Sequence, residues 1–383
     1  MRILHLGATF FVAALRRLGH EVFSAALSGG DCDISHPINV MQLYAELRAQ
    51  GFTPDVAIYC DNGNLPLFLE MESLPCLSFF YSVDTYCNDW HMPYMHLFDH
   101  CFVAQKEYAA LAASDTGGKA EWLPLFAFAS MLDGLQREAQ ERQEAAPKTR
   151  PQEKAANAGV QRRDAARHGE RTDGMQAAAE AWLTVRDLPA VFVGTQQPRN
   201  NPQRLPFLEN FQRLHPLHSL QGNFVPIFQR ARIVLNQSAA EEVNFRCFEA
   251  MACGAALLTE DSPHGLKALF TAGETILPVY ERGNAVQAAA IAKTALHHPQ
   301  ELAALALRGQ QLVRERHLDT HRAAVLLAQA AALAGSGLQQ ERLRDKAGRQ
   351  AFAHTAYGMI ALDMRDPALT QHRDFFLRLA AEG

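Results

Sequence analysis

Short apolar runs alternate with helical patterns along most of this chain, and that alternation limits its possible folds more than any other feature. In the N-terminal third, the runs typical of buried strands are RILHLG (2–7), EVFSAAL (21–27), DVAIYC (55–60), PCLSFFYSV (75–83) and HCFVAQ (100–105). Helical patterns such as FFVAALRRLG and MQLYAELRAQG separate these runs and end at a glycine. Because such strands are apolar on both faces, the pattern predicts an α/β fold with a parallel sheet covered by helices on either side.

A second alternating unit follows further along the chain. Its strand-like runs are AVFVGT (190–195), LHSLQG (217–222), RIVLNQ (232–237), AALLTED (255–261) and GETILPVY (273–280). Two such units in tandem predict two Rossmann-like, doubly wound domains that face a cleft. Residues 284–334 then have a helical pattern, and residues 338–383 are expected to form one or two amphipathic helices in a C-terminal tail.

A segment of different composition lies between the two units. Within residues 136–174, Val160 is the only residue among Val, Ile, Leu, Met, Phe, Trp and Tyr. Such a segment buries too little apolar surface to offset the entropy of ordering it, so we expect a disordered or loosely helical insert. The predicted organisation is an N-terminal domain at 1–128, an insert at 129–185, a second domain at 186–330 and a helical tail at 331–383.

The composition argues against several classes of function. The formal net charge is −5, which gives no electrostatic basis for nucleic acid as the main partner. No apolar run approaches the roughly 20 residues that span a bilayer, and no charged region precedes the first apolar run as in a signal peptide. The seven cysteines are scattered with no Cys-x-x-Cys pair, which disfavours a zinc site or a disulfide framework. We therefore expect a protein of the reducing cytoplasm with no transmembrane segment.

The most informative stretch runs from Arg232 to Asp261. A buried strand is followed by the polar loop SAAEEVN, and the loop opens a helix at about Asn244. Asparagine is a favourable N-cap, and the amides of a first helical turn form a positive pole that stabilises a diphosphate without a metal ion. Arg246 lies in that first turn, where it can add a charge-assisted contact to the same group.

Glutamates lie on both sides of this helix start. Glu249 is a turn and a half into the helix, where its carboxylate can accept two hydrogen bonds from ribose hydroxyls, and Gly254 ends the helix. Glu241 lies in the loop, so that it and Glu249 can face one crevice at the carboxyl ends of the strands. The adjacent Glu242 could take the same role, although the spacing favours Glu241. The structural alternative is that Glu241 and Glu242 are solvated loop carboxylates and that Glu249 interacts favourably with the helix dipole.

The stretch resembles the donor-binding motif of group 1 GT-B glycosyltransferases, in which two glutamates with seven residues between them accompany the sequence EAMACG. More narrowly, the chain is similar to the CgeB-like branch, named after spore-maturation proteins. The segments that carry this likeness are YSVDTYCNDWH (81–91), FDHCFVAQKEY (98–108), EWLPL (121–125), VFVGTQQPRNNPQR (191–204), HSLQGNFVPIFQRARIVLNQS (218–238) and NFRCFEAMACGAALLTED (244–261). Together they extend over about residues 1–128 and 186–330.

The resemblance implies a GT-B fold, in which the second domain mainly binds a nucleotide-diphosphate sugar and the first mainly holds the acceptor. It also implies sugar transfer without a metal ion, with retention at the anomeric carbon, and we expect no other cofactor. On this basis, Glu241 would approach the donor sugar, Glu249 the ribose, and Asn244 with the helix amides the diphosphate. The other residues expected at the donor are Gly7, Gly194, Arg199, Arg204 and Arg246, with Arg199 or Arg204 neutralising the leaving group.

Polar residues after the N-terminal strands are the candidates for acceptor-side chemistry, since α/β folds place ligand groups at the carboxyl ends of strands. Asp84 in YSVDTY is the first choice and His91 the second. A cap or turn role is the structural alternative for Asp84. Tyr81 and Trp90 are candidate stacking partners for a sugar, the alternative being a place in the core.

Two other functions compete with glycosyl transfer. An epimerase of nucleotide sugars uses the same fold but needs acid and base groups at the sugar ring, which the sequence does not reveal. A non-catalytic GT-B-like protein would act as a binding or scaffold subunit, with the insert or the tail docking a partner protein. The residues that argue against such a loss of activity are Glu241, Asn244, Arg246 and Glu249. The base of the donor stays open, and the acceptor is a glycan, a protein or a small molecule.

Overall fold

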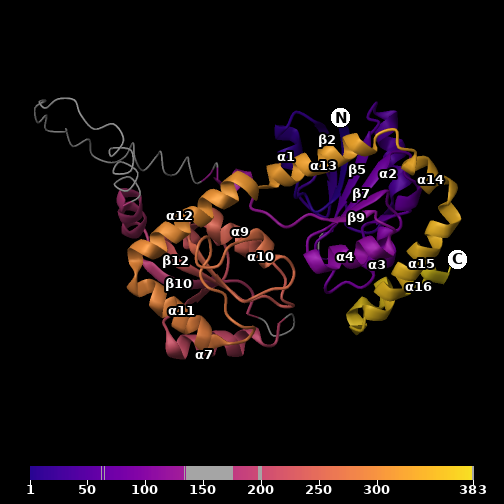
Figure 1. Ribbon diagram of the computed structural model, residues 1–383. Coiled ribbons are helices and arrows are strands. Elements are labelled where there is room, and N and C mark those ends of the chain that lie inside the picture. The colour runs from indigo at the N-terminus through magenta and orange to yellow at the C-terminus, as the bar shows by residue number, and fades with distance from the viewer. Residues whose placement is uncertain (62, 64, 133, 135–175, 197–200, 382–383) are drawn as a thin grey trace, which may run out of the picture. The chain divides into compact units, whose positions relative to one another are not determined.

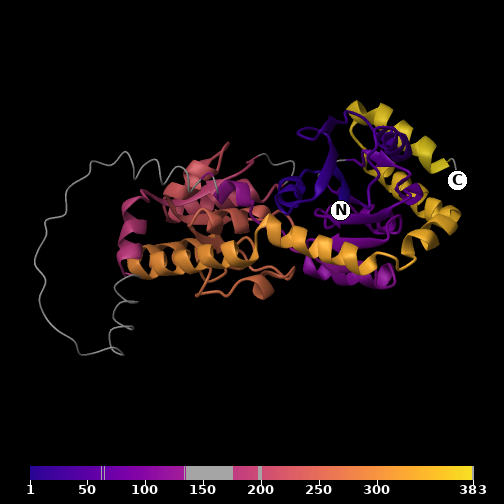
Figure 2. The same ribbon diagram turned by 90° about the horizontal axis from the view of Figure 1, so that it is seen from above.

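A computed structural model of the chain describes residues 1–61, 63, 65–132, 134, 176–196 and 201–381. The chain divides into two compact units, which Figures 1 and 2 show from two directions. The first unit comprises Met1–Phe126, Pro263–Gly265 and Asp319–Gly383, and the second comprises Ala127–Ser262 and Leu266–Leu318. The insert predicted at 136–174 lies outside the described residues.

The first unit is built on a parallel sheet of seven strands in the order β3-β2-β1-β5-β7-β8-β9. These strands are β1 (Arg2–Gly7), β2 (Glu21–Ala26), β3 (Cys32–Asp33), β5 (Val56–Cys60), β7 (Leu77–Ser82), β8 (His100–Val103) and β9 (Ala120–Trp122), and a separate pair is formed by β4 (Ile38–Asn39) and β6 (Phe68–Leu69). The helices between them are α1 (Val12–Arg17), α2 (Val40–Ala49), α3 (His91–Met95) and α4 (Lys106–Asp115), with a 3-10 turn at Met71–Ser73. Both β5 and β7 are buried along their whole length, as the apolar runs predict for strands covered on two faces.

Helices from the C-terminal part of the chain complete this unit. They are α13 (Asp319–Leu333), α14 (Leu338–Arg344), α15 (Lys346–Asp363) and α16 (Thr370–Ala381), with a 3-10 turn at Pro367–Leu369. Figure 1 shows them along the outside of the first unit, and their residues Tyr357, Ile360 and Phe376 share one core with the strands. The predicted helical C-terminal region is confirmed, but over residues 338–381 it consists of the three helices α14, α15 and α16 and not of the one or two expected. Its predicted start at 331 falls inside α13, and the structure assigns the chain to the first unit already from Asp319.

One buried ion pair ties these helices to the first sheet. Arg342 of α14 and Asp99 have no exposed side-chain surface, and Arg342 Nε lies 2.9 Å from Asp99 Oδ1. The guanidinium also donates to the carbonyl oxygens of Glu72 and Cys76, both at 2.7 Å. Asp99 accepts a further hydrogen bond from the Ser78 backbone N–H at 2.8 Å. Because each polar atom of the pair has a partner, the attraction can offset the cost of burying the two charges.

The second unit contains a parallel sheet of four strands in the order β11-β10-β12-β13. The strands are β10 (Leu188–Val193), β11 (His218–Leu220), β12 (Ala231–Asn236) and β13 (Ala256–Thr259). The helices are α7 (Arg204–Leu214), α8 (Val225–Arg230), α9 (Phe245–Ala252), α10 (Leu266–Leu269), α11 (Ala285–His297) and α12 (Pro299–Arg316), and residues 176–184 are also helical.

The strand predicted at 273–280 is the clearest difference between sequence and structure in this unit. The segment runs beside β13, where Leu277 N–H bonds the Leu257 carbonyl at 3.0 Å and Tyr280 N–H bonds the Thr259 carbonyl at 3.2 Å. Pro278 lies between these two bonds. The two donors are three residues apart whereas their acceptors on β13 are two apart, so the segment has one residue more than a regular ladder allows, and only isolated bridges remain.

A buried arginine joins three elements of the second unit. Arg186 donates to the carbonyl oxygens of Phe228 at 2.8 Å, Ala231 at 2.5 Å and Cys253 at 2.7 Å. These carbonyls lie at the ends of α8 and α9 and at the start of β12. Gly254 ends α9, as predicted, with a φ of 78°, and a Cβ atom there would lie 2.7 Å from Arg186 Nη2. Glycine is therefore required both for the turn and for the space the guanidinium occupies.

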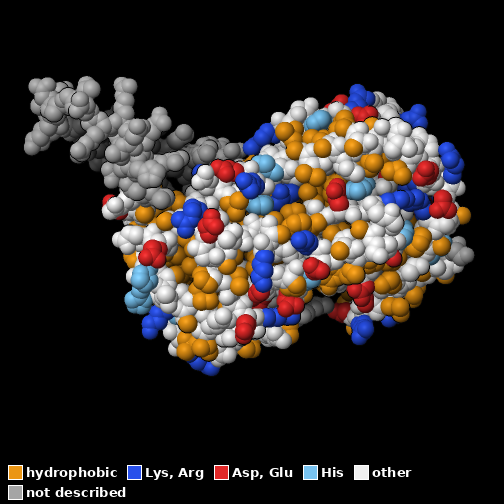
Figure 3. Space-filling model, in the orientation of Figure 1, with side chains coloured by type: hydrophobic (Ala, Val, Ile, Leu, Met, Phe, Trp, Pro, Cys, Tyr) orange, Lys and Arg blue, Asp and Glu red, His pale blue; other side chains and the backbone are white. Residues whose placement is uncertain are grey.

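Charged side chains of both signs are interspersed on the face seen in Figure 3. Within the described ranges, no helix is long and apolar enough to cross a membrane. All seven cysteines of the chain are free, and five of them are buried.

Replacing Arg342 with alanine should lower the free energy of unfolding by about 3–5 kcal/mol, because Asp99 would stay buried without its charged partner. Urea denaturation measures this difference. Arg344→Ala on the same helix is the matched control, since Arg344 is exposed, and should cost less than about 0.5 kcal/mol. Similar losses in both variants would contradict the role given to the buried pair.

Candidate functional site

Helix α9 begins at the residue that the sequence predicts, at the carboxyl edge of the second sheet. Asn244 is its N-cap residue and has an extended backbone, but its side chain makes no capping hydrogen bond. The side-chain oxygen instead lies 3.8 Å from Cys247 Sγ. The predicted helix start is therefore confirmed, whereas the predicted side-chain cap is wrong.

A pocket of about 310 Å³ lies at the N-terminal end of α9. Its walls come from the end of β10, the start of α7, the loop before α8, α8 itself and the first turns of α9. Among the residues predicted for donor binding, those that line it are Gly194, Arg204, Asn244, Arg246 and Glu249. Because β10 and β12 are parallel neighbours, their carboxyl ends bring these separate segments together at one edge of the sheet.

Arg246 supplies positive charge to this pocket. Its guanidinium donates to the Val193 carbonyl and to Asn236 Oδ1, both at 3.0 Å, and lies 4.7 Å from the centre of the Phe192 ring. Burial and the nearby charge of Arg204 lower its pKa to about 10, so it stays charged at neutral pH. Gly194 leaves the space for this side chain, since a Cβ atom there would collide with Arg246 Nη2.

Arg204, the first residue of α7, adds a second cation. Its Nε donates to Gln237 Oε1 at 3.0 Å and its Nη1 to the Thr195 carbonyl at 2.9 Å. Its guanidinium carbon lies 5.6 Å from the Phe192 ring. Two guanidinium groups on one pocket disfavour each other, and a bound anion relieves that repulsion through charge-assisted hydrogen bonds. The site is therefore suited to an anionic group.

Glu249 lies in the same pocket, largely buried beside Arg246. Burial raises its pKa to about 7, and the positive charge of Arg246 opposes the shift. Within the part of the chain that the structure describes, no hydrogen bond reaches its carboxyl group. A ligand with two hydroxyl donors could therefore bind there, and the hydrogen bonds would favour the ionised form.

The structure separates the two adjacent loop glutamates. Glu242 is buried, and its carboxylate accepts hydrogen bonds from the backbone N–H groups of Ala239 at 3.1 Å and Ala240 at 2.7 Å. Its side chain thus braces its own loop. Glu241 has 38% of its side chain exposed, and its Oε2 lies 3.4 Å from Arg282 Nη1. The accessible carboxylate is therefore that of Glu241, although it is not among the residues that line the pocket of Glu249.

The backbone of Glu241 is held in a conformation that few side chains adopt. Its φ is 63°, which costs a non-glycine residue of order 1–3 kcal/mol and persists only when the surroundings impose it. The carbonyl of Glu241 accepts a hydrogen bond from the Ser262 hydroxyl, and the Ala239 carbonyl accepts one from Arg282 at 3.0 Å. These contacts hold the loop on both sides of Glu241.

Two further buried residues, Asn201 and Glu260, hold the start of this loop, and the sequence pattern did not predict them. The buried side chain of Asn201 donates to Gln237 Oε1 at 2.9 Å. The buried carboxylate of Glu260 accepts a hydrogen bond from the Ser238 backbone N–H at 2.6 Å. Glu260 directly follows an apolar strand, and this position is the one sequence feature that indicates a role at the carboxyl edge of the second sheet. Asn201 lies in a polar loop with no such signal.

In the first unit, the buried carboxylate of Asp61 organises the loops that follow β5 and β7. It accepts hydrogen bonds from the backbone N–H groups of Gly63 at 2.8 Å and Asp84 at 2.9 Å. Asp84 is partly exposed, and its own carboxylate accepts a hydrogen bond from the Tyr86 hydroxyl at 3.1 Å. Asp84 therefore lies at the carboxyl edge of the first sheet, where its side chain is accessible to solvent.

His91, the second choice for the acceptor side, lies inside the first unit with no exposed surface. Its Nδ1 is 2.8 Å from Ser82 Oγ, and its Nε2 is 3.8 Å from Asp61 Oδ2. Burial lowers its pKa to about 3, so the ring is neutral. In this conformation His91 contacts core residues and not solvent. Tyr81 and Trp90 are buried as well, so the core alternative holds for both rings.

Gly7 has a structural explanation that needs no ligand. It ends β1 with a φ of 80°, and a Cβ atom there would collide with the Cys60 carbonyl and come within 2.8 Å of Tyr59 Cε2. The close approach of β5 therefore requires glycine at this position. Arg199 lies outside the described residues. In the described ranges, no group of three or more His, Cys, Asp or Glu is placed to hold a metal ion.

Part of the sequence matches a known protein family. Residues 171–328, which include the whole pocket, match the model of a family described as glycosyl transferase-like. Among curated proteins, none matches the sequence of the chain.

Solved structures share the fold at low sequence identity. Anabaena HepE in complex with UDP and glucose is 12% identical with a TM-score of 0.54, and the match covers 87% of this chain and 100% of that one. A glycosyltransferase from Rickettsia africae is 10% identical with a TM-score of 0.52, covering 87% and 98%. A UDP-forming α,α-trehalose-phosphate synthase from Burkholderia vietnamiensis is 11% identical with a TM-score of 0.53, covering 88% and 98%. The GT-B fold class is thereby confirmed, and with the family match it supports a glycosyltransferase of the GT-B type.

The raised pKa of Glu249 should make the stability of the protein depend on pH. The folded pKa is about 7 against an ordinary value of 4.5, so folding favours the protonated form and stability falls as the pH rises through this window. Relative to Glu249→Gln, the wild-type protein should lose about 1–3 kcal/mol of unfolding free energy between about pH 5 and pH 8. Urea denaturation of both proteins at the two pH values measures this loss. A constant difference between them would show that Glu249 does not titrate in this range.

Proposed function

We propose that this protein is a glycosyltransferase that binds a nucleotide-diphosphate sugar in the pocket at the start of α9 and transfers the sugar to an acceptor. The observation that carries the proposal is the convergence of Arg204, Arg246 and Glu249 on that one pocket. Its two cations suit a diphosphate, and its single carboxyl group suits the hydroxyls of the adjoining ribose. The family match over residues 171–328 supports the same activity.

The diphosphate would bind Arg246 and the first-turn amides of α9. Arg246 is held by the Val193 carbonyl and Asn236, so little side-chain entropy is lost when an anion binds. Charge that develops on the leaving diphosphate is stabilised by Arg246 and Arg204, which are already in place and need no reorganisation. On this proposal the two guanidinium groups and the helix amides supply the positive charge, and transfer proceeds without a metal ion.

Glu249 would bind the ribose and Glu241 would act at the donor sugar, with retention at the anomeric carbon. Two observations favour Glu241 over Glu242. Its carboxylate is partly exposed, and its backbone is held in a strained conformation by hydrogen bonds from other segments to its loop. Asp84 is the residue we propose for the acceptor side, because its carboxylate is accessible at the carboxyl edge of the first sheet. The CgeB-like branch within the glycosyltransferases and a cytoplasmic location also belong to this proposal.

A UDP-sugar is the donor to test first. Anabaena HepE was solved with UDP and glucose, and the Burkholderia vietnamiensis enzyme is UDP-forming. The pocket of about 310 Å³ lies at the lower end of the range for small-molecule sites and fits the nucleotide part of such a donor. The acceptor is a glycan, a protein or a small molecule.

Glu249→Ala should weaken the binding of UDP at least about tenfold, since two hydrogen bonds from the ribose would lose their charged acceptor. Isothermal titration calorimetry of UDP with the full chain measures the dissociation constant. Glu209→Ala is the control, because Glu209 is exposed on α7 outside this pocket, and should leave the constant unchanged. If Glu249→Ala bound UDP with an unchanged dissociation constant, the proposed binding of the ribose by Glu249 would be wrong. Absence of binding to any nucleoside diphosphate by the wild-type protein would favour the scaffold alternative.

Glu241→Gln should slow the release of UDP from a UDP-sugar by at least about tenfold while the dissociation constant for UDP stays the same. The reason is that the carboxylate is proposed to act on the sugar and to make no contact with the nucleotide. Glu242→Gln, by contrast, should lower stability, because its carboxylate holds two backbone N–H groups. If Glu241→Gln weakened UDP binding as much as it slowed UDP release, the assignment of Glu241 to the sugar would be wrong.

A further inference from the structure

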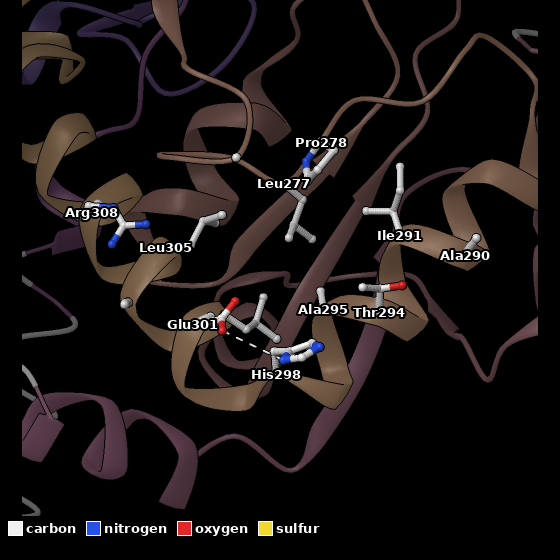
Figure 4. Close-up of a pocket in the computed structure, with 13 residues that line it drawn as sticks. Leu277, Pro278, Ala290, Ile291, Thr294, Ala295, His298, Glu301, Leu305 and Arg308 are labelled. Carbon is white, nitrogen blue, oxygen red and sulfur yellow. Dashed lines mark ion pairs between the residues drawn. The ribbon is translucent and has the colours of Figure 1, made fainter.

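A second pocket in the second unit shares no residue with the candidate donor pocket. Its volume is about 600 Å³, against about 310 Å³ for the donor pocket. It lies between α11, α12 and the segment Gly273–Pro278, and Figure 4 shows the residues that line it. This volume is in the range of sites that bind small molecules, and the proposed sugar transfer does not use it.

The hollow follows from the residues that the two helices present. On α12, Leu302, Leu305 and Arg308 recur at helical spacing and so lie on one face. On α11, the small residues Ala290 and Ala295 face the same space. Because these two alanines cannot fill the distance to α12, a gap stays open between the helices.

The interior of the hollow is apolar. Leu277, Leu302 and Leu305 are at most 6% exposed and form its floor. Ile291 is partly exposed and forms a wall. Because the three leucines are already almost fully buried, a ligand gains the usual value of about 25 cal/mol for each Å² of apolar surface removed from water mainly at the partly exposed wall around Ile291. A sugar would find few partners for its hydroxyl groups on these walls, so an apolar body fits them better.

The charged side chains lie at the rim of the hollow, and the charge differs between its two ends. In Figure 4, Arg308 lies at one end, Ile291 and Ala290 lie toward the other, and Leu305 and Leu277 lie between them. Glu301 Oε1 lies 3.9 Å from His298 Nδ1, a contact that is an ion pair only when the histidine is protonated. Arg308 Nε donates to the Glu274 carbonyl at 2.9 Å, which orients the guanidinium. No carboxylate forms an ion pair with Arg308 in the described part of the chain, so the Arg308 end keeps its positive charge.

A neighbouring polar pocket adjoins this end and carries charges of both signs. Its volume is about 370 Å³, and its charged lining is Lys267, Arg308, Arg316, Glu274 and Glu315, with Lys267 Nζ 2.7 Å from Asp261 Oδ2. Arg308 thus stands where the apolar hollow meets a polar region. A ligand that bridges the two would place an anionic group at Arg308 and an apolar body in the hollow.

We propose that this hollow binds a single lipid-like amphiphile with a phosphate head. The head bonds the Arg308 guanidinium, and the alkyl body lies over Leu305 and Leu277 toward Ile291. A cationic amphiphile is disfavoured by the charge of Arg308, and a wholly apolar molecule leaves that charge without a partner. The site is separate from the donor pocket, so this proposal stands or falls independently of the proposed transfer.

Titration calorimetry of the full chain with monomeric octyl phosphate tests the proposal. We expect saturable binding at one site per chain. Arg308→Gln should weaken it at least tenfold, and Ala295→Trp should abolish it by filling the hollow. Arg213→Gln is the matched control, because Arg213 is exposed on α7 and lines none of these pockets, and should bind as the wild type does. Melting temperatures of the variants establish that each one folds.

Three further ligands separate the sources of any signal. Inorganic phosphate should bind far more weakly than octyl phosphate because it lacks the apolar body, and octyl glucoside should bind more weakly because it lacks the charge. Saturating UDP should leave the binding of octyl phosphate unchanged. Displacement by UDP would place the amphiphile in the donor pocket and overturn the proposal. Absence of binding, or equal affinity in Arg308→Gln and Arg213→Gln, would overturn it as well.

Discussion

Two guanidinium groups, the buried one of Arg186 and the partly buried one of Arg246, hold α9 at its two ends, and the candidate donor pocket depends on that restraint. At the C-terminal end, Arg186 bonds the Cys253 carbonyl at 2.7 Å, and Trp182 bonds the Gly254 carbonyl, also at 2.7 Å. At the N-terminal end, Arg246 spans from the helix to Val193 and Asn236. A helix of eight residues has few hydrogen bonds of its own, so its direction is decided by what its ends contact. The position of its first-turn amides is thus a property of the whole unit.

The same kind of contact recurs in the first unit. Arg322 of α13 donates to the carbonyls of Pro124 at 2.7 Å and Leu125 at 3.1 Å, and Arg342 of α14 reaches four carbonyls as well as Asp99. Arginine suits this work because its planar group carries five donors in a fixed arrangement and is more weakly hydrated than the ammonium group of lysine. Chain segments that end with unpaired carbonyls are in this way joined to helices distant in sequence.

The parts of this protein that sequence could predict are those encoded locally. Apolar runs located the strands, and the parallel order of the strands then explains why Gly194, Arg204, Arg246 and Glu249 share one pocket. Prediction from sequence falls short where contacts between residues distant in sequence determine the local structure. Asn244 has the residue type of a cap, yet its side chain makes no capping bond. At Gly7 the close approach of β5 also requires glycine, which the sequence pattern does not show, and its place at the donor stays a prediction. The assignment of α13 to the first unit depends on Arg322 and Pro124, which are 198 residues apart.

The whole of the second unit lies in sequence between the first and last parts of the first unit, so the first unit cannot be completed before the second has been synthesised. The seven strands of its sheet are translated early, but α14 to α16 follow only after the second unit is complete. Until then Asp99 has no guanidinium partner, and the core positions beside Tyr357 and Phe376 have no helix over them. Domains commonly fold in the order of their synthesis. Here the portion of the chain that leaves the ribosome first is the last to be finished, and its apolar surface is open to chaperones and to misassociation for the longest time.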